Sequence, residues 1–467
     1  MKPLPLRLDR SAKTPLPEQI RQGISTAIET GVLAPGARLP SWLDLAAQLG
    51  VSRGTVRSAY DKLFNAQLIV SSRSAGTHVA DRLAPTRRSE LPAEPGSFLD
   101  MYRSFNSGHA VFQLGIPAHD AFPAKLIARI RSQAIRAEAT APTTYPNPQG
   151  ELELRREVAA HLAIARGIEC SPSQIIITSG FAGGLGLALR ALGLEGRRAW
   201  MEDPGFPGTR RGLEIAKLTL APIPVDENGI DVDYGRQHAP EAALAVVTPG
   251  QQAPLGFTLS PERRRGLLDW AADAKAWVIE DDYLSELQLD GRAAGALAAA
   301  DRAGRVIHIG SFSKTISPTL RLGFVVVPDP ITEHFVETAI CLAPAPGRSV
   351  QLGTAEFMRE GHYMRHLRRM KRIYAARRNA LKACLETRAP DLSVAGLAML
   401  LRLPGKASDT AIAKDAAAFG LAPAPLSRWY MRESLAVRGL LLGIATVQER
   451  TLKACCDRLF QTIDRHT

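Results

Sequence analysis

Short, uninterrupted apolar runs alternate with amphipathic stretches over residues 175–327 of this 467-residue chain. The runs are too short to span a bilayer, and their lack of polar alternation indicates strands that are buried on both faces. A largely parallel sheet covered by helices provides that burial, so the pattern predicts an α/β domain. The six runs are Ile175–Ile177, Ala199–Met201, Leu244–Val247, Trp277–Ile279, Val306–Ile309 and Gly323–Val327.

Polar clusters follow five of these runs. In open parallel sheets, ligands bind beyond the carboxyl ends of the strands. We therefore expect the clusters to meet in one site. They are Thr178-Ser179-Gly180, Glu202-Asp203-Pro204-Gly205, Thr248-Pro249-Gly250-Gln251, Glu280-Asp281-Asp282-Tyr283 and Ser311-Phe312-Ser313-Lys314.

Lys314 is the residue that points most clearly to a chemistry. A primary amine in this setting predicts the lysine that forms an imine with pyridoxal 5'-phosphate (PLP). Asp281 is expected to pair with the protonated pyridine nitrogen and keep the ring an electron sink. Tyr283 is expected to hydrogen-bond the ring hydroxyl. A lone aspartate at a strand end is more often a cap or turn residue, so the prediction rests on the order and spacing of the clusters together.

The remaining polar residues predict a phosphate site. Ser179 and Gly180 open a glycine-rich helix, whose free amides suit a phosphate group. Ser311, Ser313 and Arg321 add hydroxyls and a cation for the same group.

The composition favours an anionic partner and a reducing compartment. The formal charge is +12 and the pI is about 9.7, for which nucleic acid is the obvious partner. Five cysteines are scattered, odd in number and without zinc-type spacing. No secretory signal and no bilayer-spanning apolar run is visible, so we expect a cytoplasmic protein without a membrane partner and without a bound metal.

The first 80 residues have the pattern of a winged helix-turn-helix. Helices are predicted over 18–30, 42–49 and 53–63, and Gly50-Val51-Ser52 forms the turn between the last two. The third helix is expected to enter the major groove of double-stranded DNA, and the hairpin that follows to act as a wing. A three-helix protein-binding domain is the alternative. The expected DNA contacts are Ser52, Arg53, Thr55, Arg57, Arg73 and Thr77.

Three motifs carry a resemblance to a known family. They are Pro15-Leu16-x-Glu18-Gln19-Ile20, Leu33-x-Pro35-Gly36-x-Arg38-Leu39-Pro40-Ser41 and Leu45-Ala46-x-x-Leu49-Gly50-Val51-Ser52-Arg53-x-Thr55-Val56. This part resembles the winged helix of GntR-type regulators. Trp42 and Leu43 depart from the Ser-Arg pair usual there, so one DNA-facing arginine is missing.

The remainder resembles fold-type I aminotransferases, and more closely the aminotransferase-like domain of the MocR subfamily of GntR regulators. The resemblance implies PLP as cofactor and a homodimer, in which Tyr145 reaches the phosphate of the neighbouring subunit. It also places Arg432 where a ligand carboxylate is held. The motifs that carry it include Tyr145-Pro146-x-Pro148-Gln149-Gly150, Ile177-Thr178-Ser179-Gly180, Glu280-Asp281-Asp282-Tyr283-x-Ser285-Glu286, Gly310-Ser311-Phe312-Ser313-Lys314-Thr315 and Leu320-Arg321-Leu322-Gly323.

Four departures from the family pattern bear on catalysis. Ala182 and Gly183 replace two amide side chains, while Gln251 and Ala253 replace a histidine and an aromatic residue beside the ring. PLP binding is still expected, whereas full transamination is not.

These observations predict three segments and a function. Residues 10–80 form the DNA-binding domain, 81–112 a linker, and 113–467 an aminotransferase-like, PLP-binding effector domain. The leading interpretation is a transcriptional regulator whose DNA binding changes when an amine, amino acid or PLP effector acts at the Lys314 imine. An aminotransferase with an auxiliary winged helix is the alternative, and a regulator that has lost the cofactor is a third.

Overall fold

The computed structural model describes residues 6, 8–12, 14–72, 76–80, 98–99, 101–102, 110–291, 293–389, 391–405 and 407–466. The chain divides into two compact units, one up to residue 94 and one from residue 95 onward. Each unit is described by itself below.

The amino-terminal unit is a three-helix bundle with a hairpin. Ser41 and Ser52 cap α2 and α3 by accepting hydrogen bonds from the third residue beyond them, and Gly50 ends α2 in the left-handed conformation that glycine adopts easily. Ile20, Ile24, Leu45 and Leu63 form its core. The elements are α1 (Leu16–Glu29), α2 (Trp42–Leu49), α3 (Arg53–Asn65) and the antiparallel strands β1 (Ile69–Ser72) and β2 (Gly76–Val79).

An eight-stranded sheet forms the centre of the second unit, in the order β3-β10-β9-β8-β7-β4-β5-β6. Strands β9, β8, β7, β4 and β5 are mutually parallel, whereas β10 runs antiparallel to both its neighbours and β6 to β5. The largely parallel sheet is as predicted. The strands are β3 (Ile175–Thr178), β4 (Arg198–Asp203), β5 (Thr219–Asp226), β6 (Gly229–Ile230), β7 (Leu244–Val247), β8 (Trp277–Asp282), β9 (Val306–Ser311) and β10 (Gly323–Val326).

Helices cover both faces of this sheet. Alternate strand residues pack against α7, α8 and α12 on one side, with Ile279 and Phe335 in that core. On the other side, two clusters lie against α6 and α13 and against α9, α10 and α11. These helices are α6 (Leu152–Arg166), α7 (Phe181–Leu192), α8 (Pro207–Ile215), α9 (Val232–His238), α10 (Pro261–Asp273), α11 (Leu297–Ala300), α12 (Thr332–Leu342) and α13 (Arg348–Arg359), and α5 (Ala124–Thr140) packs on α13.

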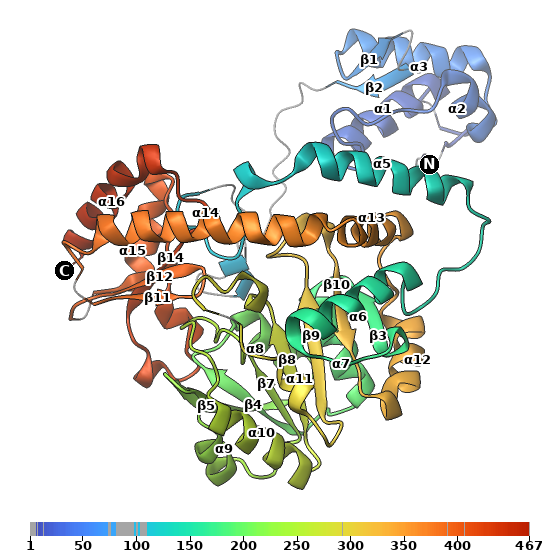
Figure 1. Cartoon of the computed structure of the whole chain (residues 1–467). Helices are drawn as coiled ribbons and strands as arrows, with labels where there is room; N and C mark the ends of the chain where they lie inside the picture. The colour runs from blue at the N-terminus through green and yellow to red at the C-terminus, as the bar shows by residue number, and fades with distance from the viewer. Residues whose placement is uncertain are drawn as a thin grey trace. The chain divides into compact units, whose positions relative to one another are not determined.

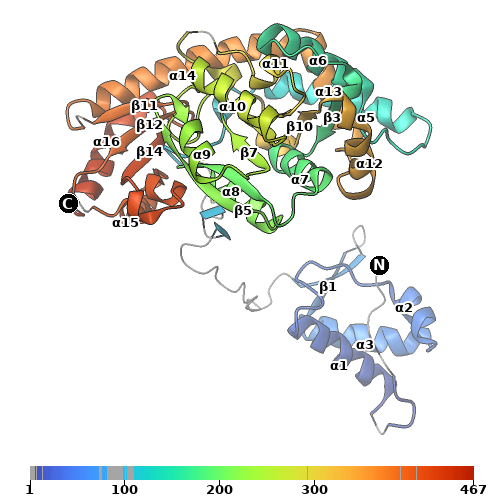
Figure 2. The same cartoon turned by 90° about the horizontal axis from the view of Figure 1, so that it is seen from below.

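A four-stranded antiparallel sheet lies at the carboxyl-terminal end, in the order β11-β12-β14-β13. Helix α14 runs from beside α13 to this smaller sheet, and so connects the two parts of the unit (Figures 1 and 2). The elements are α14 (His362–Leu385), β11 (Leu392–Ala395), β12 (Ala398–Arg402), α15 (Asp409–Ala416), β13 (Ala424–Pro425), β14 (Gly439–Gly443) and α16 (Glu449–Asp464).

Single 3-10 turns complete the description. They are η1 (His119–Ala121), η2 (Pro172–Gln174), η3 (Ser285–Leu287), η4 (Pro318–Leu320), η5 (Asp329–Ile331), η6 (Ala417–Phe419), η7 (Leu426–Trp429) and η8 (Glu433–Leu435).

Candidate cofactor site and DNA-binding surface

Lys314 lies in the loop that follows β9, at the carboxyl edge of the large sheet. Its amine donates a hydrogen bond to the carbonyl of Gly115 at 2.5 Å. Burial lowers the pKa of Lys314 to about 8, and the negative charge of Asp281 partly opposes that shift. Near neutrality about a tenth of an amine with this pKa is uncharged, far more than for an ordinary lysine, and the uncharged amine is the nucleophilic form.

Asp281 stands near the end of the adjacent strand β8, in register with Ile309 of β9. The carboxylate is buried, and no residue in the described part of the chain donates a hydrogen bond to it. Burial raises its pKa well above the usual value, Asp282 and Glu202 raise it further, and Lys314 lowers it. A buried carboxylate without a donor suits a cationic ring nitrogen.

Tyr283 follows Asp281 at the same strand end. Burial raises the pKa of its hydroxyl, and the nearby carboxylates of Asp281 and Glu202 act in the same direction. The hydroxyl is therefore a neutral donor, which suits the role predicted for it at a ring oxygen.

Among the residues predicted to hold phosphate, Gly180 and Ser313 lie close together at the start of α7. Gly180 precedes that helix with φ +85°, and a Cβ on it would lie 3.8 Å from the Ser313 hydroxyl. Ser311 accepts a hydrogen bond from the amide of Ser313 and faces Gly323 across the β9–β10 pair. Arg321 is exposed and has no ion-pair partner among the described residues. Helix amides, hydroxyls and a guanidinium without an ion-pair partner in the described chain are the groups that suit an anion such as phosphate.

The departure at Gly183 has a structural reason. A Cβ at this position would lie 2.4 Å from the hydroxyl oxygen of Ser179. In this structure the Ser179 hydroxyl fills the space beside residue 183, so a side chain at that position would require the hydroxyl to rotate away. Ala182, by contrast, is exposed in the same turn.

Gln251 and Ala253, the departures from the family pattern, lie in a loop whose glutamine side chains hydrogen-bond to other parts of the protein. Gln251 donates to the carbonyl of Leu284, and the neighbouring Gln252 donates to Glu202 and to the carbonyl of Pro204. Burial raises the pKa of Glu202 to about 7, although hydrogen bonds from Thr248 and Gln252 oppose the shift. This loop thus contributes a polar network beside the site in place of a histidine and an aromatic residue.

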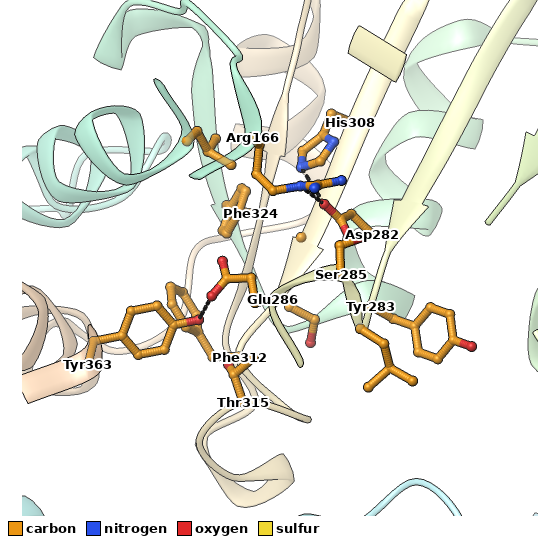
Figure 3. Close-up of a pocket in the computed structure, with 14 residues that line it drawn as sticks. Arg166, Asp282, Tyr283, Ser285, Glu286, His308, Phe312, Thr315, Phe324 and Tyr363 are labelled. Carbon is orange, nitrogen blue, oxygen red and sulfur yellow. Dashed lines mark hydrogen bonds and ion pairs between the residues drawn. The ribbon is translucent and has the colours of Figure 1, made fainter. Parts of the chain in front are cut away.

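A second polar network lies behind β8, around a cavity of about 20 Å³ (Figure 3). Arg166 pairs with Asp282 at 2.6 Å, while Glu286 accepts hydrogen bonds from His161 and Tyr363. The network reaches the Lys314 loop, because His366 of α14 hydrogen-bonds the carbonyl of Thr315. Glu286 stands in one of the quoted family motifs, whereas His366 and the partners of both residues were not predicted.

The structure also shows the surroundings of Arg432 and Tyr145, the two remaining residues that the resemblance assigned to ligand binding. The guanidinium of Arg432 bonds to the buried Asp203 at 2.9 Å and to the Tyr234 hydroxyl at 3.2 Å, so its charge is already paired. Tyr145 is fully exposed on the chain.

Four of the six predicted DNA-binding residues, Ser52, Arg53, Thr55 and Arg57, lie at the start of α3. The hydroxyl of Ser52 caps the helix by accepting from the amide of Thr55, and Arg53 and Arg57 are exposed without a partner among the described residues. Thr77 lies on β2, where its carbonyl accepts a hydrogen bond from Leu39. Arg73 lies outside the described residues.

Arg38 is a further basic residue of this surface that was not among the predicted contacts. It is exposed, pairs with His78 of the hairpin through its backbone, and would lie 3.4 Å from a Cβ at Gly76. Its place in the GntR motif was the only signal in the sequence.

Comparison with known proteins agrees with this architecture. Residues 16–79 match the family of bacterial regulatory proteins of the gntR family, and residues 112–419 match aminotransferase class I and II. A probable rhizopine catabolism regulatory protein of Rhizobium meliloti, MocR, is 32% identical over 96% of this chain and 94% of its own length. The chain belongs to the MocR-type GntR regulators. The pyridoxine biosynthesis regulator PdxR of Corynebacterium glutamicum is 33% identical to this MocR-type regulator, over 82% of this chain and 81% of its own length. The regulator TauR of Rhodobacter capsulatus is 31% identical, over 79% of this chain and 80% of its own length.

Solved structures similar to the MocR-type regulator show the fold of its larger unit. An archaeal alanine:glyoxylate aminotransferase superposes with a TM-score of 0.72 at 23% identity, covering 79% of this chain and 95% of its own. A Pyrococcus horikoshii kynurenine aminotransferase, in complex with PMP, has a TM-score of 0.71 at 23% identity over 81% and 96%. The predicted fold class and the predicted regulator family are thus confirmed.

No helix in the described ranges is long and apolar enough to cross a membrane.

Proposed function

We propose that this DNA-binding regulator holds PLP at Lys314 and that the state of that site changes its affinity for double-stranded DNA. The observation that carries the proposal is the pairing of a half-buried amine of lowered pKa with a buried carboxylate that lacks a donor. In a folded protein such a carboxylate lowers the stability unless a ligand supplies a hydrogen-bond donor or a positive charge to it.

The residues present fit the cofactor at each of its polar groups. Asp281 would hold the ring nitrogen, Tyr283 the ring hydroxyl, and the start of α7 with Ser313 and Arg321 the phosphate. When bound, PLP supplies an aldehyde that exchanges amines and a ring that withdraws electrons. The chain's own contribution is to orient the ring and to lower the pKa of the lysine amine, so that more of it is uncharged than in an ordinary lysine.

An amine is the class of effector that this site supports best, with PLP itself as the variant. A carboxylate on the effector would compete with Asp203 for Arg432, because those two side chains are already paired. The effector acts on DNA only if it prefers one arrangement of the protein over another. The fully exposed Tyr145 supports a homodimer in which this side chain serves the neighbouring subunit.

Transamination is the second candidate, and the lowered pKa of Lys314 favours it. The loss of the ring-facing groups at Gln251 and Ala253 weighs against it. Steady conversion of an amino acid to its 2-oxo acid by purified protein, without specific DNA binding at physiological salt, would establish the enzyme and overturn the regulator proposal.

The direct test of cofactor binding is visible absorbance after addition of PLP. The wild-type protein should develop an imine band that Lys314→Ala abolishes. Lys453→Ala is the matched control, because this lysine is exposed on α16 and has no ion-pair partner in the described chain. Equal spectra for all three proteins would contradict the proposal.

A further inference from the structure

The bond between Lys314 and Gly115 joins residues 199 positions apart. Gly115 belongs to residues 110–118, an irregular stretch that we call the strap. In the sequence, the strap overlaps the end of the predicted linker of residues 81–112. It is therefore the part of the effector domain that meets the connection to the DNA-binding domain.

Both ends of the strap are held by other parts of the fold. Its first residues pair with the small carboxyl-terminal sheet, where Phe112 is buried with φ +70°. Its last residue bonds to α14 through the Tyr374 hydroxyl. Between them, Gly115 is bonded to the Lys314 loop of the large sheet. The hydrogen bonds at the ends are Val111 N to Gly420 O, Ala422 N to Val111 O, Gly443 N to Phe112 O and Ala118 N to Tyr374 Oη.

Position 115 requires glycine for two reasons. Its φ is +75°, which other residues adopt at a cost, and a Cβ there would lie 2.9 Å from the Lys314 nitrogen. Any larger residue would displace the amine or the strap.

We propose that the Gly115 carbonyl is a positioning group that holds the Lys314 amine whenever that nitrogen is not joined to the cofactor, so that the strap reports the state of Lys314 to the linker. The proposal rests on the function proposed above. It adds a named acceptor and a named segment through which an effector acts.

The chemistry of the nitrogen supplies the switch. When the amine condenses with an aldehyde, water leaves with the aldehyde oxygen and two hydrogens from nitrogen, and a carbon–nitrogen double bond forms. As a neutral imine, the lysine nitrogen carries no N–H, so its hydrogen bond to the Gly115 carbonyl is lost. When an effector amine takes over that carbon, its nitrogen gives up two hydrogens and Lys314 regains two. The bond to Gly115 then forms again.

Hydrogen exchange of the strap amides tests this inference. In the cofactor-free protein, the amides of Val111 and Ala118 should exchange slowly, because both are hydrogen-bonded. Lys314→Ala should speed their exchange about tenfold without any cofactor, since it removes one hydrogen bond from a strongly polar donor. Unchanged exchange in Lys314→Ala would overturn the inference and leave the cofactor proposal standing.

Addition of PLP to wild-type protein provides the second arm. Appearance of the imine absorbance together with faster strap exchange supports the inference, and absorbance with unchanged exchange overturns it. If no absorbance appears, the cofactor proposal fails, and the inference about the strap fails with it as a signalling device.

A glycine pair controls for backbone strain. Gly115→Ala should abolish the effect of PLP on DNA affinity. Gly196→Ala should leave that effect intact, because Gly196 has a nearly equal φ of +78° but its Cβ would meet nothing within 4 Å. Equal responses from the two variants would show that strain alone matters. If Gly115→Ala does not fold, Lys314→Ala still decides the question.

Discussion

At the scale of single residues, burial sets the chemistry of the site. The Lys314 amine and the Asp281 carboxylate are partly or fully removed from water. The carboxylate raises the pKa of Lys314 and the amine lowers the pKa of Asp281, so each group favours the charged form of the other. This opposition leaves Lys314 with a pKa of about 8, between that of an ordinary lysine and that of a fully desolvated one. The residue-scale account therefore predicts a specific pH dependence.

The rate at which PLP joins Lys314 should rise with pH and level off above about 8, because only the uncharged amine attacks. Asp281→Asn removes the negative charge that raises the pKa of Lys314, so the midpoint should move to lower pH. The same variant should weaken PLP binding by at least about tenfold, since a charge-assisted hydrogen bond is lost. Stopped-flow absorbance at a series of pH values measures both effects. A midpoint that stays in place in Asp281→Asn would show that the two groups do not interact.

Arg432 is predicted to stabilise the fold through Asp203. Removing it in Arg432→Ala leaves a buried carboxylate without its cation and should cost about 3 kcal/mol of unfolding free energy. Arg438→Ala is a control for general loss of an arginine, because the exposed Arg438 lies in the same segment and has no ion-pair partner among the described residues. Denaturant titration gives the difference, and an unchanged midpoint for Arg432→Ala would argue that the pair contributes nothing.

At the scale of elements, the start of α7 shows how neighbouring side chains decide which residues fit. The Ser179 hydroxyl occupies the space beside residue 183, so a side chain there would have to displace it, whereas Ala182 is exposed and leaves room for a larger side chain. Gly183→Gln should therefore destabilise the protein by about 1–3 kcal/mol through overpacking and should weaken phosphate binding, while Ala182→Gln should do neither. Thermal unfolding with and without inorganic phosphate compares the two, and similar melting temperatures for both variants would contradict this account of the helix start.

The same scale shows what sequence patterns predict well. All six apolar runs are strands of the large sheet, because uninterrupted apolar sequence is diagnostic of burial on both faces. Strand β5 was missed, since Pro222 and Pro224 interrupt its pattern next to the edge of the sheet. The antiparallel direction of β10 was not predictable either, because direction depends on the connection and not on composition.

Site residues divide in a similar way. Lys314, Asp281 and the serines stand at strand ends in recognisable motifs, and the structure places them at one edge of the sheet. Gly115 stands in no such motif. Its contact with Lys314 arises only when the chain returns after 199 residues, so local pattern carries no signal for it.

At the scale of the whole molecule, one chain contains a DNA-binding unit and an effector unit. The chain acts as a regulator only if ligand binding to the effector unit changes the free energy of DNA binding. On α3 of the DNA-binding unit, Arg53 and Arg57 are exposed and have no partner among the residues that the structure describes, as a sequence-reading helix requires. Arg53→Ala should weaken DNA binding by about 1–3 kcal/mol if it contacts a base, whereas a phosphate contact would instead lower the salt dependence. Fluorescence anisotropy across a salt series distinguishes the two, and unaltered binding would exclude Arg53 from the interface.

The central claim is that the state of Lys314 controls affinity for DNA. It is tested most directly by the dissociation constant for the DNA that flanks the gene, measured with and without PLP for wild type and Lys314→Ala. We predict that PLP changes the wild-type constant by about fivefold or more, the range of ordinary allosteric coupling, and leaves that of Lys314→Ala unchanged. An identical response in both proteins, or no response in the wild type to PLP or to any amine, would contradict the claim.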